Sequence, residues 1–169
     1  MKKHLIVLLV LVLFAITLPT SAQDDFEGET PIVGSVWVTE QMSFPATAGM
    51  GLVTPNLIGL GGSGEALAGM TWYDYSGTLL DNVVGEAISK IISGSLTYNV
   101  CAQVTTITRD GINKGGSGRE CGEIGVGSQK RASHKVWEDV HAYWVTNTWH
   151  EFSRIGTYWA PILQVSANP

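Results

Sequence analysis

Charged residues are scarce in this chain, and positively charged ones most of all. Of its 169 residues only 10 are Lys or Arg, against 15 Asp or Glu, which gives a formal net charge of −5 at pH 7. Non-specific binding to nucleic acid and an electrostatic hold on anionic lipid both need a basic surface. The composition therefore predicts no nucleic-acid partner and leaves membrane contact as a minor alternative.

The chain also lacks an apolar run of the roughly 20 residues that a membrane-spanning helix needs. Its longest apolar run extends only from Leu5 to Leu18, after Lys2 and Lys3 and before small residues that end at Ala22. This order is typical of a secretory signal peptide. We expect cleavage near Ala22 and a secreted, extracellular protein of bacterial character, whose net charge becomes −7 once Lys2 and Lys3 are removed from the −5 of the full chain.

Cysteine is nearly absent, since the chain has only Cys101 and Cys121. In an exported protein an even number of cysteines predicts a disulfide. A hairpin that turns at Asp110-Gly111 would place the two cysteines directly opposite each other. A metal site needs more ligands than two, and a catalytic thiol needs a neighbouring base. The sequence therefore predicts a structural disulfide between Cys101 and Cys121.

Beyond the leader, short alternating segments rich in β-branched and aromatic residues are separated by turn signals. Strands are expected at 31–42, 66–75, 95–108, 120–126, 134–148 and 156–165, with loops at 46–64, 110–118 and 127–133 and a turn within 149–155. This spacing predicts an all-β protein built as an antiparallel β-sandwich. We expect three parts: a signal peptide (1–22), a flexible acidic start (23–30) and a single sandwich domain (31–169).

The segment 78–93 fits two structures. Its apolar residues recur every four positions, as on one face of a helix, and Glu86 and Lys90 would form a pair on the other face. Gly85 and several β-branched residues oppose a helix, and the neighbouring segments are strands. The sequence favours a strand and leaves a short helix at 78–92 open.

Catalytic patterns are missing. Ser63 follows two glycines but Glu65 breaks the G-x-S-x-G pattern of a nucleophile elbow. His134, His141 and His150 are spaced too widely for a zinc motif. We therefore predict no catalytic residue, no metal and no cofactor.

Aromatic residues are the most suggestive feature, because exposed rings on a rigid sheet can stack on sugars or fill protein interfaces. One predicted binding surface consists of Trp137, His141 and Tyr143. A turn carrying Trp149 and His150 is the other.

The order of a Cys-bearing hairpin, an aromatic strand reaching His141, and Trp149-His150-Glu151 before Gly156-Thr157 resembles small secreted bacterial β-sandwich proteins of unknown function. The likeness covers residues 95–160 and implies only the fold and export.

Together these features predict a non-enzymatic binding or cell-envelope module, whose partner is a cell-wall glycan or another extracellular protein. Two alternatives remain. One is a membrane-active toxin or bacteriocin-like protein that inserts the uncharged stretch 46–64 or an amphipathic 78–92. The other is a small extracellular hydrolase.

Overall fold

The structure is a computed structural model that describes residues 30–44, 61–75, 81–154 and 157–169. Residues 31–169 form one compact unit. The predicted signal peptide, residues 23–29 of the acidic start and residues 46–60 of the predicted loop lie outside the described residues. Within the described part, no helix has the length and apolar character needed to cross a membrane.

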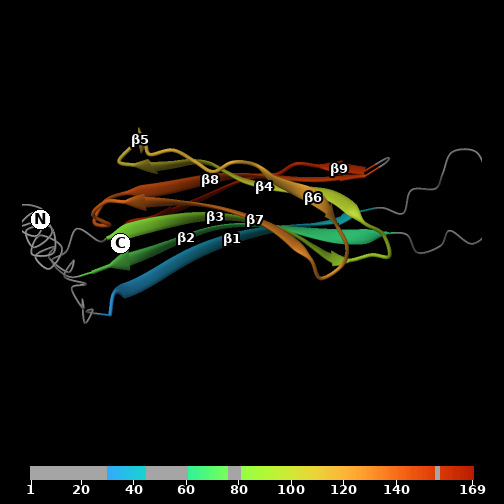
Figure 1. The fold of residues 1–169 in the computed structure, drawn as a ribbon, viewed down its shortest axis with the longest axis horizontal. Helices are drawn as coiled ribbons and strands as arrows, with labels where there is room; N and C mark the ends of the chain where they lie inside the picture. Colours follow the sequence, from blue (N-terminus) through green and yellow to red (C-terminus); the bar gives the residue numbers. More distant parts are fainter. Residues whose placement is uncertain (1–29, 45–60, 76–80, 155–156) are drawn as a thin grey trace, which may run out of the picture. The chain divides into compact units, whose positions relative to one another are not determined.

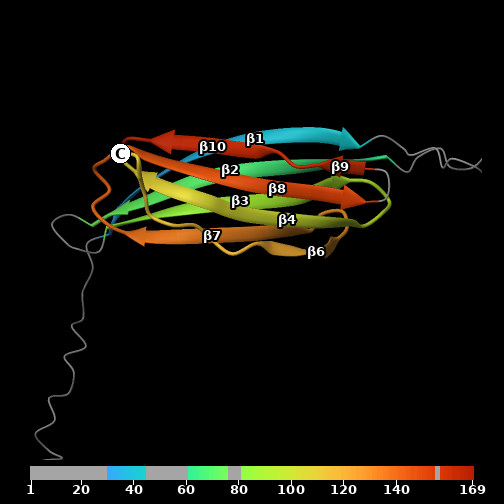
Figure 2. The ribbon, with the colours of Figure 1, turned by 90° about the horizontal axis from the view of Figure 1, so that it is seen from above.

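The strands form two antiparallel sheets that pack face to face, which is the predicted β-sandwich (Figure 1). The first sheet has the order β1 (Ile32–Phe44), β2 (Gly62–Asp74), β3 (Asn82–Ser93) and β7 (Gln129–Trp137). The second has the order β10 (Ile162–Ala167), β8 (Trp144–Arg154), β4 (Tyr98–Arg109) and β5 (Ile112–Asn113), while β6 (Glu120–Ile124) also pairs with β4 and β9 (Thr157–Trp159) with β8. Seen from above, the strand axes of the two sheets are nearly aligned, although the individual strands alternate in direction (Figure 2).

The segment 82–93 is strand β3, so the helical alternative is wrong for these residues. Val83, Ala87 and Ile91 are fully buried between the sheets. Val84 and Ile88 lie on the opposite face of the strand and are half-buried. Because β3 is central in its sheet, it carries apolar residues on both faces, and this arrangement imitates a four-residue period. The predicted Glu86–Lys90 pair does not form, and Glu86 instead pairs with Arg131 of β7.

The two sheets approach each other closely at Gly85. A Cβ atom there would lie 2.7 Å from Cδ1 of Ile107 and 2.8 Å from Cγ2 of Thr146, both on the second sheet. We therefore expect Gly85→Ala to lower the free energy of unfolding by roughly 2 kcal/mol through overpacking. Urea unfolding followed by tryptophan fluorescence measures this loss. Gly118→Ala is the matched control and should be neutral, because nothing lies within 4 Å of its Cβ position.

The predicted loop 46–64 extends too far at its end, because β2 already begins at Gly62. Neighbouring atoms lie so close to the backbone there that only glycine fits. A Cβ at Gly62 would lie 2.7 Å from the carbonyl oxygen of Ser93, and one at Gly64 would lie 2.7 Å from the ring of Phe44. A glycine-rich segment therefore forms a strand where its neighbours leave no room for side chains.

Four further expectations in the last third differ from the structure. The single strand predicted at 134–148 is two strands in different sheets, since β7 ends at Trp137 and β8 begins at Trp144. The turn predicted within 149–155 lies inside β8 as far as Arg154. The loop predicted at 127–133 is shorter, because β7 begins at Gln129. The strand at 134–148 was predicted as one because apolar and polar residues keep alternating through 138–143, where the chain crosses between the sheets. The last predicted strand is divided into β9 and β10, with Pro161 just before β10.

The predicted disulfide hairpin is confirmed. Asp110 and Gly111 turn the chain with positive φ angles of 49° and 82°, so that β5 folds back on β4. Further along, Cys101 and Cys121 are directly paired positions of β4 and β6 and form the disulfide. The register shifts by one residue between the two paired regions: the chain from Ile112 to Cys121 is one residue longer than the opposing chain from Cys101 to Arg109. That residue is accommodated in the stretch 114–119, between β5 and β6.

Candidate functional site

Residues 138–143, called the crossover below, carry the chain from β7 in the first sheet to β8 in the second. Trp137 immediately precedes this segment and Tyr143 is its last residue, and their side chains are 58% and 52% exposed. The exposed side chain of His141 lies between them in sequence. All three residues of one predicted binding surface, Trp137 with His141 and Tyr143, are therefore exposed, and their binding of a ligand stays a prediction.

Ion pairs and backbone hydrogen bonds attach the crossover to the tip of the β4–β5 hairpin. The Glu138 carboxylate accepts hydrogen bonds from Nη1 of Arg109 at 3.1 Å and Nζ of Lys114 at 2.6 Å. Lys114 above all, with help from Arg109, lowers the pKa of Glu138. The backbone N–H of Tyr143 donates to Oδ1 of Asp110 at 3.0 Å, and the N–H of Asp110 donates to the carbonyl oxygen of Tyr143 at 2.8 Å.

Buried residues hold the inner side of the crossover. Val140 and Ala142 are buried in the core, and the indole Nε1 of Trp144 donates to the carbonyl oxygen of Val140 at 2.9 Å. Because alternate side chains are buried, Asp139, His141 and Tyr143 are exposed. The exposed groups are thus presented on a backbone that is fixed on its other side.

Three carboxylates lie around the His141 ring. Oδ1 of Asp139 accepts the backbone N–H of His141 at 2.9 Å and lies 3.0 Å from Nδ1 of its ring. Oδ2 of Asp74, at the end of β2, lies 3.7 Å from Nε2. The hydrogen bond to Asp139 raises the pKa of His141, and the charges of Asp74, Asp139 and Asp81 add to this effect. The backbone hydrogen bond from His141 in turn lowers the pKa of Asp139.

Asp81, Asp139 and His141 are the side chains of the described part that could hold a metal ion, since one ligand atom of each lies within 4.8 Å of the others. Carboxylate oxygen and imidazole nitrogen are ordinary ligands for divalent transition metals. All three groups already have hydrogen-bond partners. Asp81 accepts the backbone N–H of Tyr75 at 2.8 Å, and Asp139 is bonded to His141.

The second predicted surface, Trp149 with His150, does not lie in a turn. Both residues are in β8, and their side chains point to opposite faces of the sheet. Trp149 is half-buried, with the guanidinium carbon of Arg119 4.0 Å from its ring centroid. His150 is fully buried, and its ring contacts the hydroxyls of Ser89 and Thr148 at 2.9 and 2.8 Å. An external ligand does not reach this ring, so we leave His150 out of the candidate surface.

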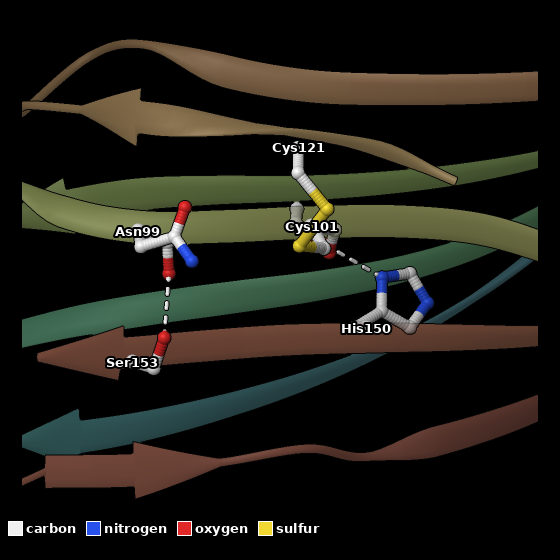
Figure 3. The surroundings of a disulfide bond; sticks show 6 residues. Asn99, Cys101, Cys121, His150 and Ser153 are labelled. Carbon is white, nitrogen blue, oxygen red and sulfur yellow. Dashed lines mark hydrogen bonds between the residues drawn. A yellow bond between two sulfur atoms is a disulfide. The ribbon is translucent and has the colours of Figure 1, made fainter.

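Burial lowers the pKa of His150 to about 4, so the ring is neutral at pH 7. Figure 3 shows the ring beside the β4 strand that carries the disulfide. The hydroxyl of Ser89, on the opposite sheet, also contacts the carbonyl oxygen of Cys101 at 2.7 Å. His150 therefore belongs to a polar bridge between the two sheets, which the sequence did not indicate.

Sequence reasoning also missed the residues that position the crossover. Asp74 and Asp81 come from the facing ends of β2 and β3, and Arg109, Asp110 and Lys114 come from the hairpin tip. Only the Asp110-Gly111 turn dipeptide gave a signal, and that signal concerned the hairpin. The pairing of these residues with 138–143 depends on which strands become neighbours.

No family model, curated protein or solved structure matches this chain. The resemblance to small secreted bacterial β-sandwich proteins therefore remains a prediction.

Proposed function

We propose that the protein is a secreted, non-enzymatic module that binds an extracellular glycan, with cell-wall polysaccharide as the first candidate. The observation that carries this proposal is the exposure of Trp137 and Tyr143 at the two ends of the crossover, which Arg109, Lys114 and Asp110 hold in place. Aromatic faces stack on the apolar faces of sugar rings, and a ring that is already fixed loses little entropy on binding.

Polar groups beside the rings suit the same ligand. Asp139 and His141 offer exposed acceptors and donors to sugar hydroxyls. The carboxylates of Asp74, Asp81 and Asp139 favour a neutral or positively charged ligand over an anionic one. One face of the Trp137 indole is near the Lys135 ammonium, whose nitrogen lies 4.7 Å from the ring centroid. These features support a polar, uncharged glycan as the partner.

Removing either ring tests the proposal. We expect Trp137→Ala and Tyr143→Ala each to weaken binding to purified cell walls about tenfold, because exposed aromatic anchors dominate such contacts. Co-sedimentation with cell walls, and in parallel with anionic liposomes, measures binding. Tyr158→Ala is the matched control, since Tyr158 is 67% exposed but lies on β9, outside the crossover.

Each result has a defined meaning. Pelleting with cell walls that depends on Trp137 and Tyr143 supports glycan binding. A protein that stays in the supernatant with cell walls contradicts the proposal. Pelleting with liposomes alone would favour the membrane-active alternative.

A further inference from the structure

Strand β1 is a long edge strand with one free side. It pairs with β2 over its whole length, from Ile32↔Asp74 to Phe44↔Gly62. Among the described strands, none pairs with its other edge. Alternate residues of an edge strand direct their N–H and C=O groups outward, where they can pair with another strand.

Large apolar side chains are exposed along this strand. They are Ile32, Val33, Trp37, Val38 and Met42, with exposed fractions of 65%, 54%, 40%, 36% and 39%. The only charged residue of β1 is Glu40, and the strand contains no proline. A long, apolar and nearly uncharged edge is a template for strand pairing.

The other sheet edges among the described residues have the usual protection, and the edge strands β5 and β9 are only two and three residues long. The opposite edge of the same sheet, β7, carries Lys130, Arg131 and Lys135. In the second sheet, β10 is only six residues long and follows Pro161, while β6 carries Glu120 and Glu123. Lysine, other charges, proline and short length are common devices against edge pairing. Apart from Glu40, β1 has none of these devices, so this edge is the candidate for pairing with another strand.

We propose that β1 pairs antiparallel with β1 of a second copy of this chain, around a twofold axis at Trp37. An edge strand is complemented by another strand, and an isologous dimer requires a surface that fits itself. The register follows from apolar matching. With Trp37 opposite Trp37 of the second copy, Val36 faces Val38 and Ile32 faces Met42.

Charge supports this register. Glu40 faces Gly34 of the second copy, so the two Glu40 carboxylates are not opposite each other. Ser35 and Thr39, which are both exposed, also face each other across the axis. The two four-stranded sheets then form one continuous sheet. This interface does not involve the crossover, so it is independent of the proposed glycan site.

Complementary charges at positions 35 and 39 test both the dimer and its register. The measurement is sedimentation velocity of protein expressed from the complete 169-residue chain, over a range of concentrations. One double variant carries Ser35→Lys and Thr39→Lys, and the other carries Ser35→Glu and Thr39→Glu. Each places like charges opposite each other twice and should weaken the dimer about tenfold or more. An equimolar mixture of the two should restore a dimer that contains one copy of each.

The matched control carries Gln129→Lys and Ser133→Lys, two exposed positions with the same spacing on β7. It should dimerise like the parent protein. Circular dichroism establishes that each variant folds, and if one charged double variant does not, the other still tests the loss of the dimer. A parent protein that is monomeric at every concentration reached overturns the proposal. So does a dimer that survives both charged double variants, or a mixture of folded variants that stays monomeric.

Discussion

Acidification from pH 6.5 to pH 4 is expected to lower the free energy of unfolding by about 3 kcal/mol through His150. In the folded protein, burial lowers the pKa of His150 from 6.5 to about 4. The folded state therefore favours the neutral ring, and the unfolded state binds the proton more tightly. This contribution to stability is complete above pH 6.5 and is lost as the pH falls through this interval.

The hydrogen bonds around His150 agree with a neutral ring. The Ser89 hydroxyl has one proton, which the carbonyl oxygen of Cys101 can accept at 2.7 Å. Nδ1 of His150 then donates to the oxygen of Ser89, and Nε2 accepts from the hydroxyl of Thr148. Each polar group of this bridge is paired without a charge. A second ring proton would place a positive charge in the core, where burial disfavours it and no carboxylate of the described residues is paired with the ring.

Urea unfolding between pH 7 and pH 4 measures the effect, and His150→Gln is the diagnostic variant. We expect this variant to be less stable than the parent protein but much less dependent on pH in this interval. His141→Asn is the control, because the raised pKa of His141 acts in the opposite sense. Its contribution is present below the unfolded pKa and is lost as the pH rises. An unchanged pH dependence in His150→Gln would show that another group causes the loss.

Loss of the Cys101–Cys121 disulfide is expected to lower the free energy of unfolding by about 3 kcal/mol. The bond joins residues 20 positions apart and therefore restricts the unfolded chain. Regular pairing of β4 with the returning chain is interrupted between β5 and β6. The disulfide is thus the covalent attachment of β6, which is only five residues long.

Thermal or urea unfolding of the double variant Cys101→Ala with Cys121→Ala measures this loss. A reductant should destabilise the parent protein to the same extent and leave the double variant unchanged. Should the reductant destabilise the double variant equally, its effect would not arise from this bond. The position of the crossover is a second readout of losing the disulfide, because Asp110 lies at the tip of the same hairpin and accepts the backbone N–H of Tyr143.

The sequence predicted those features that depend on local patterns. Alternation predicted β4, the turn dipeptide Asp110-Gly111 predicted the hairpin, and the positions of Cys101 and Cys121 predicted their pairing. The two-layer architecture followed from the number of such segments. The strand, the turn and the cysteine pairing are each specified within a short stretch of the chain.

The errors arose where a long-range neighbour decides the structure. Alternation continues through 138–143, although buried Val140 and Ala142 lie in a segment between two sheets. His150 resembles a surface residue in sequence, and only its placement opposite Ser89 makes it part of the core. The sequence therefore singled out Trp137, His141 and Tyr143, which are exposed, while their binding role stays a prediction. The ion pairs that hold the crossover were not predicted.

The attachment of the crossover to the hairpin tip also implies an order of assembly. The hairpins β1–β2 and β2–β3 join neighbouring segments, whereas β3–β7 and β4–β8 join distant ones and pay more loop-closure entropy. Residues 138–143 connect these two late pairings and also need Arg109 and Lys114 in place. We expect the exposed rings to reach their final positions among the last events of folding, so a partly folded chain would not display them together.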